Sequence, residues 1–152
     1  MKNFFSYRLK SINLVIAEEN KAITGVFFGT KPPIGFVKAE TPLIKKAAAQ
    51  IEEYLAGKRK KFTLPLVLRG TEFQVAVWRA LQDIPYGETR SYKEIAAAIG
   101  RPKAVRAVGM ANNRNPISII IPCHRVIGHD GSLVGYGGGL PLKRRLLELE
   151  QE

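Results

Sequence analysis

The residues of this chain best suited to chemistry form the run Pro122-Cys123-His124-Arg125, which places the only cysteine beside one of the two histidines. Cysteine attacks as its thiolate, and a neighbouring imidazole or cation lowers the thiol pKa from its usual value of about 8.5. His124 and Arg125 supply both kinds of neighbour. The run therefore predicts a nucleophilic cysteine. The alternative is a buried structural cysteine, which is the commoner use of a lone thiol.

Cysteine and histidine counts limit the kinds of site that the chain can build. One cysteine excludes an internal disulfide, and one cysteine with two histidines is too few for a structural zinc site, so we expect no metal. The 152 residues are 45% hydrophobic, enough for one domain or two small ones. No apolar run approaches the ~20 residues that span a bilayer, and the N-terminus lacks a signal peptide. We therefore expect a cytoplasmic protein.

The formal net charge of +11 indicates a polyanionic partner, although an even coat of surface lysines would give the same total. Residues 1–69 carry 13 Lys or Arg and 5 Asp or Glu, against 11 and 8 in residues 70–152, so total charge does not locate a binding face. Between residues 90 and 125, however, Glu94 is the only acid. That stretch holds seven basic residues: Arg90, Lys93, Arg101, Lys103, Arg106, Arg114 and Arg125. We expect phosphate contacts there.

The elements before residue 70 are predominantly β-strands. Segments 13–17 and 22–28 are rich in β-forming residues and are separated by a polar turn at 18–21, which predicts a small meander. Thr41 and Pro42 then open a helix that ends at Gly57. The basic run 58–61 is interpreted as a solvated turn, with DNA contact as the alternative, and a strand is expected at 62–68.

Helices dominate after a boundary near Arg69-Gly70. Thr71 with Gln74 and Ser91 with Glu94 are capping-box signatures for two helices, the second ending at Gly100. Another helix is expected from Lys103 to about Asn113, packed on one side and facing phosphates on the other. This pair around a Gly-Arg-Pro turn predicts a helix-turn-helix.

Strands expected at 117–121 and 132–134 make the helix-turn-helix a winged variant, and a final helix begins at Pro141. The glycine run 135–139 lacks the dinucleotide and GK[ST] fingerprints, which favours a flexible loop or close substrate approach over a phosphate cradle. The sequence thus predicts an α/β (α+β) protein with domains 1–69 and 70–152.

Nearly all of residues 70–150 resembles the O6-alkylguanine-DNA alkyltransferase family. The core signature is matched by residues 121–127. Five further segments that match the family lie before the signature, in the family's order: Phe73-Gln74-Val75-Ala76-Val77-Trp78, Ile84-Pro85-Tyr86-Gly87-Glu88-Thr89, Ser91-Tyr92, Arg106-Ala107-Val108-Gly109 and Asn115-Pro116. One more, Gly135-Tyr136-Gly137-Gly138-Gly139, lies after it. Residues 1–69 resemble the family only in outline, as a β-rich domain that in this family is similar to ribonuclease H.

The resemblance implies a single-turnover DNA repair reaction without a cofactor. The alkyl group of O6-alkylguanine, and that of O4-alkylthymine as a further substrate, would pass irreversibly from duplex DNA to a cysteine after the damaged nucleotide is flipped out of the stack. The protein would be both reagent and catalyst. Such a protein is expected to act as a monomer, and in a microbe to associate with the nucleoid.

The resemblance also assigns roles within the site. Cys123 would be the nucleophile, His124 would accept its proton through a water, and Glu150 would orient His124. Asn115 would brace the active-site turn, and Tyr92 would donate a proton to the departing guanine, although ordinary packing is the alternative for this tyrosine. The base pocket would be lined by Tyr136, Gly137 and the backbone around Val126.

For DNA, the resemblance implies that Arg106 enters the base stack as a finger while its helix lies in the minor groove. A repair protein must find damage in any sequence. Binding in the minor groove suits this task, because the donor and acceptor groups there distinguish the base pairs less well than those of the major groove. Low sequence specificity and strongly salt-dependent affinity follow. The further DNA contacts are expected from Ser91, Lys93, Arg101, Lys103 and Arg125.

Departures from the family pattern leave two other interpretations open. The residues that bind zinc in some relatives have no counterparts in this sequence, so we do not expect a zinc site. Alkyltransferase-like proteins replace the nucleophile and only bind lesions, whereas Cys123 favours a working transferase. A winged-helix protein that only binds DNA would leave the sequence around Cys123 unexplained. A cysteine hydrolase would use the same Cys-His-acid set with multiple turnovers.

Overall fold

The computed structural model describes residues 1–152, and its internal contacts divide the chain into two compact units. The first unit comprises Met1–Leu68 with Pro116–Ile120, and the second comprises Arg69–Asn115 with Ile121–Glu152. The mixture of sheet and helix confirms the expected α+β class. Residues 116–120, placed by the sequence analysis within the domain 70–152, pack with the first unit.

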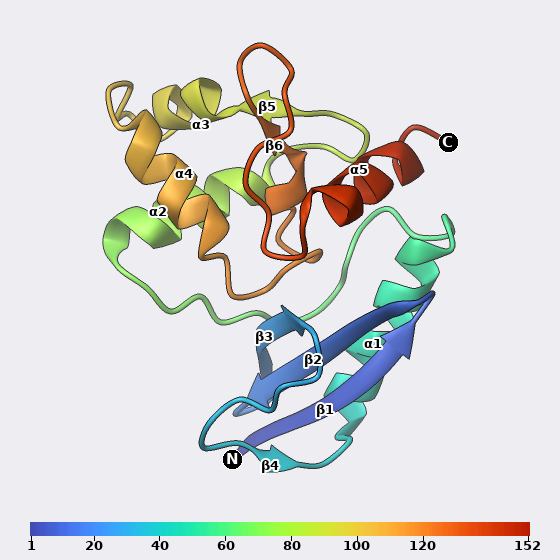
Figure 1. The fold of residues 1–152 in the computed structure, drawn as a ribbon. Coiled ribbons are helices and arrows are strands. Elements are labelled where there is room, and N and C mark those ends of the chain that lie inside the picture. Colours follow the sequence, from blue (N-terminus) through green and yellow to red (C-terminus); the bar gives the residue numbers. More distant parts are fainter. The chain divides into compact units, whose positions relative to one another are not determined.

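Four strands form the sheet of the first unit: β1 (Lys2–Leu9), β2 (Ile12–Glu19), β3 (Ala22–Phe28) and β4 (Val37–Lys38) (Figure 1). Their order is β3-β2-β1-β4, with β1 parallel to β4 and the other pairs antiparallel. Two-residue turns at Lys10-Ser11 and Asn20-Lys21 have positive φ, which matches the twist of a hairpin. The expected meander is confirmed, with its second turn confined to residues 20 and 21.

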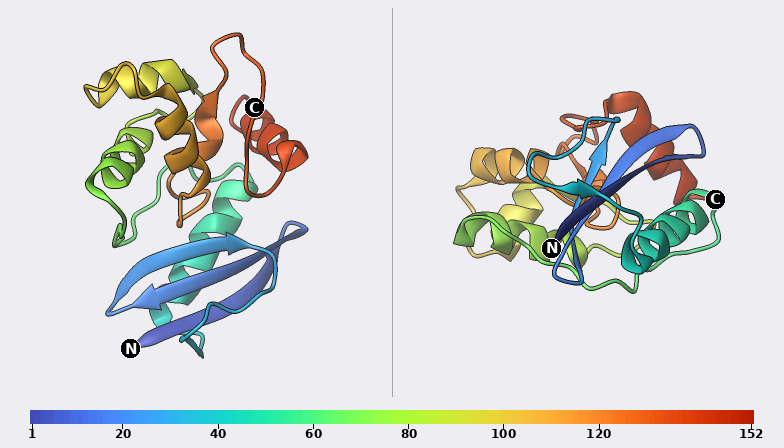
Figure 2. Two further views of the ribbon diagram at one scale, coloured as in Figure 1. Left: turned by 60° about the vertical axis from the view of Figure 1, so that its left-hand side comes forward. Right: turned by 90° about the horizontal axis from the view of Figure 1, so that it is seen from below.

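Helix α1 (Pro42–Leu55) covers one face of this sheet (Figure 2). Thr41 caps it, since its Oγ1 accepts a hydrogen bond from the backbone N–H of Ile44 at 3.2 Å, and Pro42 occupies the first turn as expected. Ile44 and Ile51 of the helix are fully buried, as is Ile16 of the sheet. These side chains form part of the core of the first unit.

The strand expected at 62–68 is wrong. Only Leu66 pairs, in a single parallel bridge to Ile23, with Ile23 N donating to Pro65 O at 2.8 Å and Val67 N to Ile23 O at 3.0 Å. Pro65 has no N–H of its own to continue a ladder. The segment therefore touches the sheet at one point.

The strand expected at 117–121 is also wrong, for a related reason. Ile117 makes one parallel bridge to Val26, and Ile119 has a φ of +70°, which turns the chain out of the extended conformation. Ile117, Ile119 and Ile121 are almost fully buried. The apolar run indicates that these residues are buried, but a buried turn and a buried strand give the same pattern.

The second unit contains α2 (Glu72–Gln82), α3 (Tyr92–Ala98) and α4 (Val105–Asn113), and the latter two form the expected helix pair (Figure 1). Both expected capping boxes are present. Gly100, at a φ of +75°, ends α3 in the left-handed conformation that favours glycine. Trp78 fixes α2 to α4, because its indole N–H donates to Ala111 O at 2.8 Å.

A two-stranded parallel sheet joins β5 (Arg90–Ser91) to β6 (Val126–Ile127), which follows the 3₁₀ turn η1 (Cys123–Arg125). The strand expected at 132–134 is wrong, because Gly128 N bonds to Ser132 O at 2.8 Å and closes a turn there. The last helix, α5 (Leu140–Leu149), begins beside Pro141 as expected. None of the helices combines the length and apolar character needed to cross a membrane.

Candidate active site

Cys123 lies at the start of η1, where the chain turns tightly between the buried apolar run and β6. Pro122 precedes the turn, and its carbonyl accepts from Arg125 N at 3.0 Å. The Cys123 N–H donates to Ile121 O at 2.8 Å. The thiol residue is 5% exposed, so the protein surrounds its side chain almost completely.

Two asparagines hold the backbone of this turn. Asn115 Nδ2 donates to Ile121 O at 2.8 Å, which places it where the sequence analysis expects a brace. Asn112, at the end of α4 and 1% exposed, donates to Cys123 O at 3.4 Å. Sequence reasoning missed Asn112, although its position three residues before Asn115 was a usable signal.

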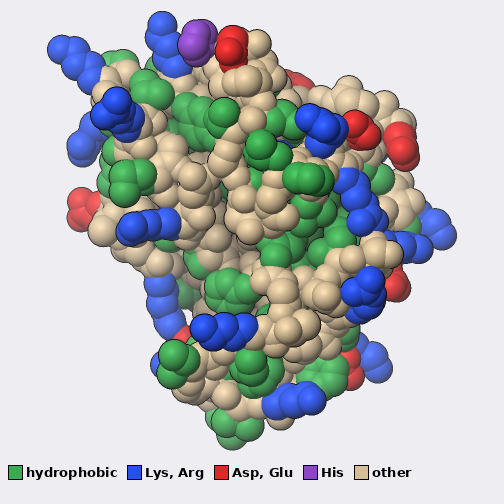
Figure 3. All heavy atoms as spheres, viewed as in Figure 1, with side chains coloured by type: hydrophobic (Ala, Val, Ile, Leu, Met, Phe, Trp, Pro, Cys, Tyr) green, Lys and Arg blue, Asp and Glu red, His purple; other side chains and the backbone are tan.

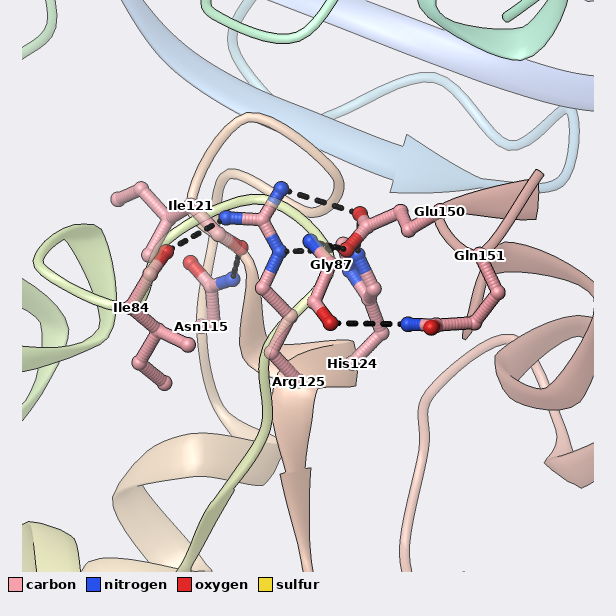
Figure 4. Close-up of polar contacts among 8 residues, drawn as sticks. All are labelled: Ile84, Gly87, Asn115, Ile121, His124, Arg125, Glu150 and Gln151. Atoms are coloured by element: carbon pink, nitrogen blue, oxygen red, sulfur yellow. Dashed lines mark hydrogen bonds and ion pairs between the residues drawn. The ribbon is translucent and has the colours of Figure 1, made fainter. Parts of the chain in front are cut away.

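His124 and Arg125 converge on Glu150, the C-cap residue of α5 (Figure 4). His124 Nε2 lies 2.8 Å from Glu150 Oε2, and Arg125 donates to the same carboxylate through Nε at 2.8 Å and through NH2 at 3.0 Å. Arg125 NH1 also donates to Ile84 O at 2.7 Å. The guanidinium stacks 5.6 Å from the ring of Tyr86. One buried carboxylate therefore organises both side chains after the nucleophile.

The loop before β5 completes the cluster. Gly87 N donates to Glu150 Oε1 at 3.2 Å, and Gln151 Nε2 donates to Gly87 O at 2.8 Å (Figure 4). Gly87 has a φ of +83°, and a Cβ there would lie 3.3 Å from Glu150 O. Glycine is thus needed both for its backbone conformation and for the close approach of the Glu150 backbone carbonyl.

Burial controls the protonation of the thiol and the imidazole. It raises the pKa of Cys123, and hydrogen bonding by Asn115 and the charge of Lys143 only partly oppose that effect. The sequence expectation that neighbouring groups lower this thiol pKa on balance is wrong for the substrate-free protein, because desolvation outweighs them. Burial also lowers the pKa of His124, against the contrary influence of Glu150. The resting pair is therefore a neutral thiol beside a neutral imidazole.

The contact with Glu150 fixes the tautomer of His124. A carboxylate can only accept, so Nε2 carries the proton and Nδ1 carries the lone pair. Glu150 is in turn oriented by Arg125. The ring can accept a further proton at Nδ1, with the resulting positive charge stabilised by the carboxylate.

Tyr92 and Tyr136 lie near this centre. The Tyr92 hydroxyl donates to Val134 O at 3.0 Å, and its ring packs against Gly109 of α4, where a Cβ would lie 3.8 Å from the ring. Burial raises the pKa of Tyr92, and the thiolate form of Cys123 raises it further, so the phenol stays protonated. Tyr136 meets the ring of His124 edge to face at a centroid distance of 6.5 Å. Two of the residues expected around the base are thus brought to the nucleophile.

The pocket loop, defined as residues 128–139, is tied down by Lys143. This fully buried lysine of α5 donates through Nζ to Val126 O at 2.6 Å and to Val134 O at 2.9 Å. Gly137 of this loop is exposed. Sequence reasoning missed Lys143, although its spacing of three from Leu146 and seven from Glu150 places it on the buried face of α5.

Helix α4 offers an exposed surface for a large partner. Arg106 is exposed in its first turn, with Val105 and Met110 exposed beside it, at 37% and 59%. Lys93, Arg101 and Lys103 are exposed on or just after α3. Figure 3 shows several basic side chains over the α3–α4 pair.

Both units match models of one family. Residues 72–152 match "6-O-methylguanine DNA methyltransferase, DNA binding domain", and residues 10–68 match "6-O-methylguanine DNA methyltransferase, ribonuclease-like domain". The chain belongs to the 6-O-methylguanine DNA methyltransferase family. Membership confirms the resemblance drawn from the sequence, including the ribonuclease-like character of the N-terminal part.

Relatives of this methyltransferase family match most of the chain. A methylated-DNA–protein-cysteine methyltransferase of Methanosarcina barkeri is 63% identical over 107 residues, covering 70% of this chain and 68% of the relative. The constitutive enzyme of that name from Bacillus subtilis is 49% identical over 146 residues, covering 91% and 88%. The crystal structure of Mycobacterium tuberculosis OGT in complex with DNA superimposes with a TM-score of 0.91 at 46% identity, covering 98% of this chain and 92% of that one.

Two residues assigned to DNA contact from the family resemblance make hydrogen bonds within the protein. Ser91 is 9% exposed, and its Oγ accepts from Glu94 N at 3.0 Å as the cap of α3. Arg125 is 7% exposed and bound to Glu150 and Ile84 O. The Arg125 side chain cannot reach a phosphate without breaking these bonds, so we leave it out of the proposed DNA interface. The Ser91 hydroxyl can still donate its own hydrogen, and its contact with DNA stays a prediction.

Proposed function

We propose that this protein repairs DNA directly, by moving the alkyl group of O6-alkylguanine in duplex DNA onto Sγ of Cys123. The observation that carries the proposal is the buried contact of His124 with Glu150 immediately after the only cysteine, in a chain of this family. No cofactor is required, because the alkyl carbon needs only a nucleophile and a proton for the leaving base.

The proposed reaction first requires that the thiol of Cys123 lose its proton. His124 accepts the thiol proton at Nδ1, through a water as the sequence analysis expects, and Glu150 stabilises the imidazolium that forms. Because burial keeps the thiol protonated at rest, the thiolate forms when a substrate is in place.

Transfer then exchanges one bond for another. The Sγ–C bond forms as the C–O6 bond breaks, and the bonding electron pair stays on the guanine. The base takes up one proton, equal to the one lost by the thiol, and becomes ordinary guanine. Tyr92 is the proposed donor, supported by its protonated state and by its position on α3 near Cys123. The proton taken up by His124 then returns to the Tyr92 phenolate through solvent, which restores both side chains. The thioether is stable, so each molecule acts once.

The damaged nucleotide must leave the duplex to reach a thiol that is 5% exposed. In the proposed complex α4 lies in the minor groove, and Arg106 fills the space that the flipped nucleotide leaves. Val105 and Met110 expose apolar side chains beside Arg106. This supports the proposal that this face of α4 enters a groove without reading base edges. Lys93, Arg101 and Lys103 contact phosphates, and Tyr136, Gly137 and the Val126 backbone line the base pocket.

The proposal includes three finer points. O4-alkylthymine is a second substrate, because it presents a comparable alkyl carbon on an exocyclic oxygen. The protein acts as a monomer, with one nucleophile for each lesion. It works within the cytoplasm and, in a microbe, at the nucleoid.

The decisive experiment incubates the purified protein with a duplex that contains one O6-methylguanine and measures the mass of the peptide bearing Cys123. Addition of one methylene that saturates at one equivalent per protein is expected. Tight lesion binding without mass gain would place the chain among binding-only relatives. Repeated turnover of an ester or amide would place it among the cysteine hydrolases.

A further inference from the structure

Most of the excess positive charge of the chain lies outside the proposed DNA interface. The basic side chains proposed to contact DNA all belong to the second unit. Residues 70–152 carry 11 basic and 8 acidic residues, a net charge of +3, whereas residues 1–69 carry 13 and 5, a net charge of +8. The proposed function therefore leaves the larger part of the charge without a role.

The longest run of basic residues in the chain lies in the first unit, directly after α1, at Lys58-Arg59-Lys60-Lys61. We call this run the basic segment. Between Glu53 and Glu72 the chain has five basic residues and no acid. A solvated turn and a DNA contact are the two interpretations that the sequence leaves open, and the contacts of the segment distinguish them.

The backbone is fixed to α1 on both sides of the basic segment. On the near side, Lys58 N donates to Glu53 O at 2.8 Å. On the far side, Thr63 N donates to Gln50 Oε1 at 3.0 Å, and Gln50 Nε2 donates to Thr63 Oγ1 at 2.9 Å. Gln50 is 4% exposed, so these two bonds attach the chain to a buried position of the helix. The segment therefore has a defined conformation.

Arg59 holds the conformation of the basic segment, whereas the lysines form its outer surface. Arg59 Nε donates to Glu53 Oε1 at 3.0 Å, and its NH1 donates to Lys61 O at 2.9 Å. Lys58, Lys60 and Lys61 are exposed. Three ammonium groups are thus presented by a backbone that is already ordered before a partner binds, which lowers the entropic cost of a contact.

We propose that the basic segment is a second phosphate-binding surface, which contacts the backbone of duplex DNA through Lys58, Lys60 and Lys61. This inference rests on the proposed function, because it extends the contact with DNA to the first unit. Glu53 is paired with Arg59, and Glu52 is the remaining acid at this end of α1, so positive charge is in excess. Lysines bind phosphates as point charges without reading bases. Such a contact suits a protein that searches DNA of any sequence.

The test variant combines three substitutions in the basic segment: Lys58→Gln, Lys60→Gln and Lys61→Gln. The matched control combines three at exposed lysines elsewhere in the first unit: Lys10→Gln, Lys21→Gln and Lys45→Gln. Affinity for an undamaged duplex is measured at a series of salt concentrations. Each phosphate contact adds about 0.9 to the slope of log affinity against log salt, so the test variant should lose about 2 to 3 from this slope and bind roughly tenfold more weakly at about 0.1 M salt. The control has the same net charge and should keep the wild-type slope.

Equal losses in the two variants would mean that total charge governs binding, and an unchanged slope in the test variant would exclude the contact. Acetylation of lysines in the wild type, measured by mass spectrometry with and without duplex, decides the matter without a variant. Bound DNA should protect Lys58, Lys60 and Lys61 from acetylation, and full reactivity of all three in the complex would overturn the proposal.

A membrane surface is the other polyanion that this test distinguishes. Binding to phosphatidylserine vesicles that the test variant loses, while its DNA slope stays that of the wild type, would assign the basic segment to lipid and overturn the DNA contact. Because the duplex is undamaged, none of these measurements depends on alkyl transfer. Absence of transfer from O6-methylguanine would refute the proposed function, and the salt series would still decide whether the basic segment binds DNA.

Discussion

His124 and Glu150 meet through a 2.8 Å contact between Nε2 and Oε2, with side-chain exposures of 0% and 1%. The same carboxylate accepts two hydrogen bonds from Arg125, so a single negative charge already has a full positive partner. Burial is the main cause of the lowered pKa of His124, and the positive charge of Arg125 adds to it, so His124 rests neutral. A proton added to His124 during the reaction would still lie against a carboxylate.

Replacing Glu150 by Gln should destabilise the protein and slow alkyl transfer. The buried guanidinium of Arg125 would lose its counter-ion, and breaking such a pair costs about 3 kcal/mol. Denaturant unfolding measures the stability, and single-turnover transfer at a temperature where the variant is folded measures the rate. Glu148→Gln, an exposed change on the same helix, should leave both within error. Equal stability of the two variants would refute an ion-paired Glu150.

Cys123→Ala should abolish alkyl transfer while DNA affinity stays within about twofold of the wild type, because the thiol is buried and DNA is bound by the exposed helices. Mass spectrometry of the protein after incubation with lesion duplex, together with a binding titration, checks both parts. Methyl transfer that persisted in this variant would exclude Cys123 as the acceptor.

Arg106→Ala should slow the reaction on lesion duplex roughly 10- to 100-fold but leave the reaction with the free modified base nearly unchanged, since extrusion of a nucleotide costs a few kcal/mol only in duplex. Single-turnover rates on the two substrates measure the difference. Arg79→Ala, which removes an equally exposed arginine from α2, is the charge-matched control. Similar losses on both substrates would argue against a role for Arg106 in the base stack.

The buried His124 should make folding stability fall as the pH drops below the ordinary histidine pKa of about 6.5. Its folded-state pKa is lowered, so the unfolded chain binds the proton more tightly, and stability present above the ordinary pKa of 6.5 is lost as pH falls below it. Melting temperature across this range should fall less steeply in His124→Gln than in the wild type. His129→Gln, at the exposed second histidine, should keep the wild-type slope. The same slope in all three proteins would contradict the neutral buried state.

Local signals in the sequence predicted the helices well. The capping boxes at Thr71 and Ser91 and the Thr41-Pro42 start are contacts among residues three apart, which a sequence displays directly. The expected strands at 62–68, 117–121 and 132–134 failed because strand pairing depends on partners far along the chain. An apolar run such as Ile117 to Ile121 is equally compatible with a buried turn.

The site was partly visible in the sequence. The positions of Cys123, His124 and Glu150 follow from motif order, and the structure brings them together. The protonation of the thiol could not be predicted, because desolvation depends on everything that surrounds it. Lys143 was overlooked because a lysine in a helix is ordinarily a surface residue, and only the packing of α5 reveals that it is buried.

The assignment of residues 116–120 to the first unit means that the chain visits that unit twice, and leaves it for the last time only three residues before the nucleophile. Neither unit corresponds to an uninterrupted stretch of the gene. A fragment starting at residue 70 would carry Ile117, Ile119 and Ile120 without the strand β3 to which their segment is bonded. Separated from the first unit, the reactive half would therefore expose these isoleucines to solvent.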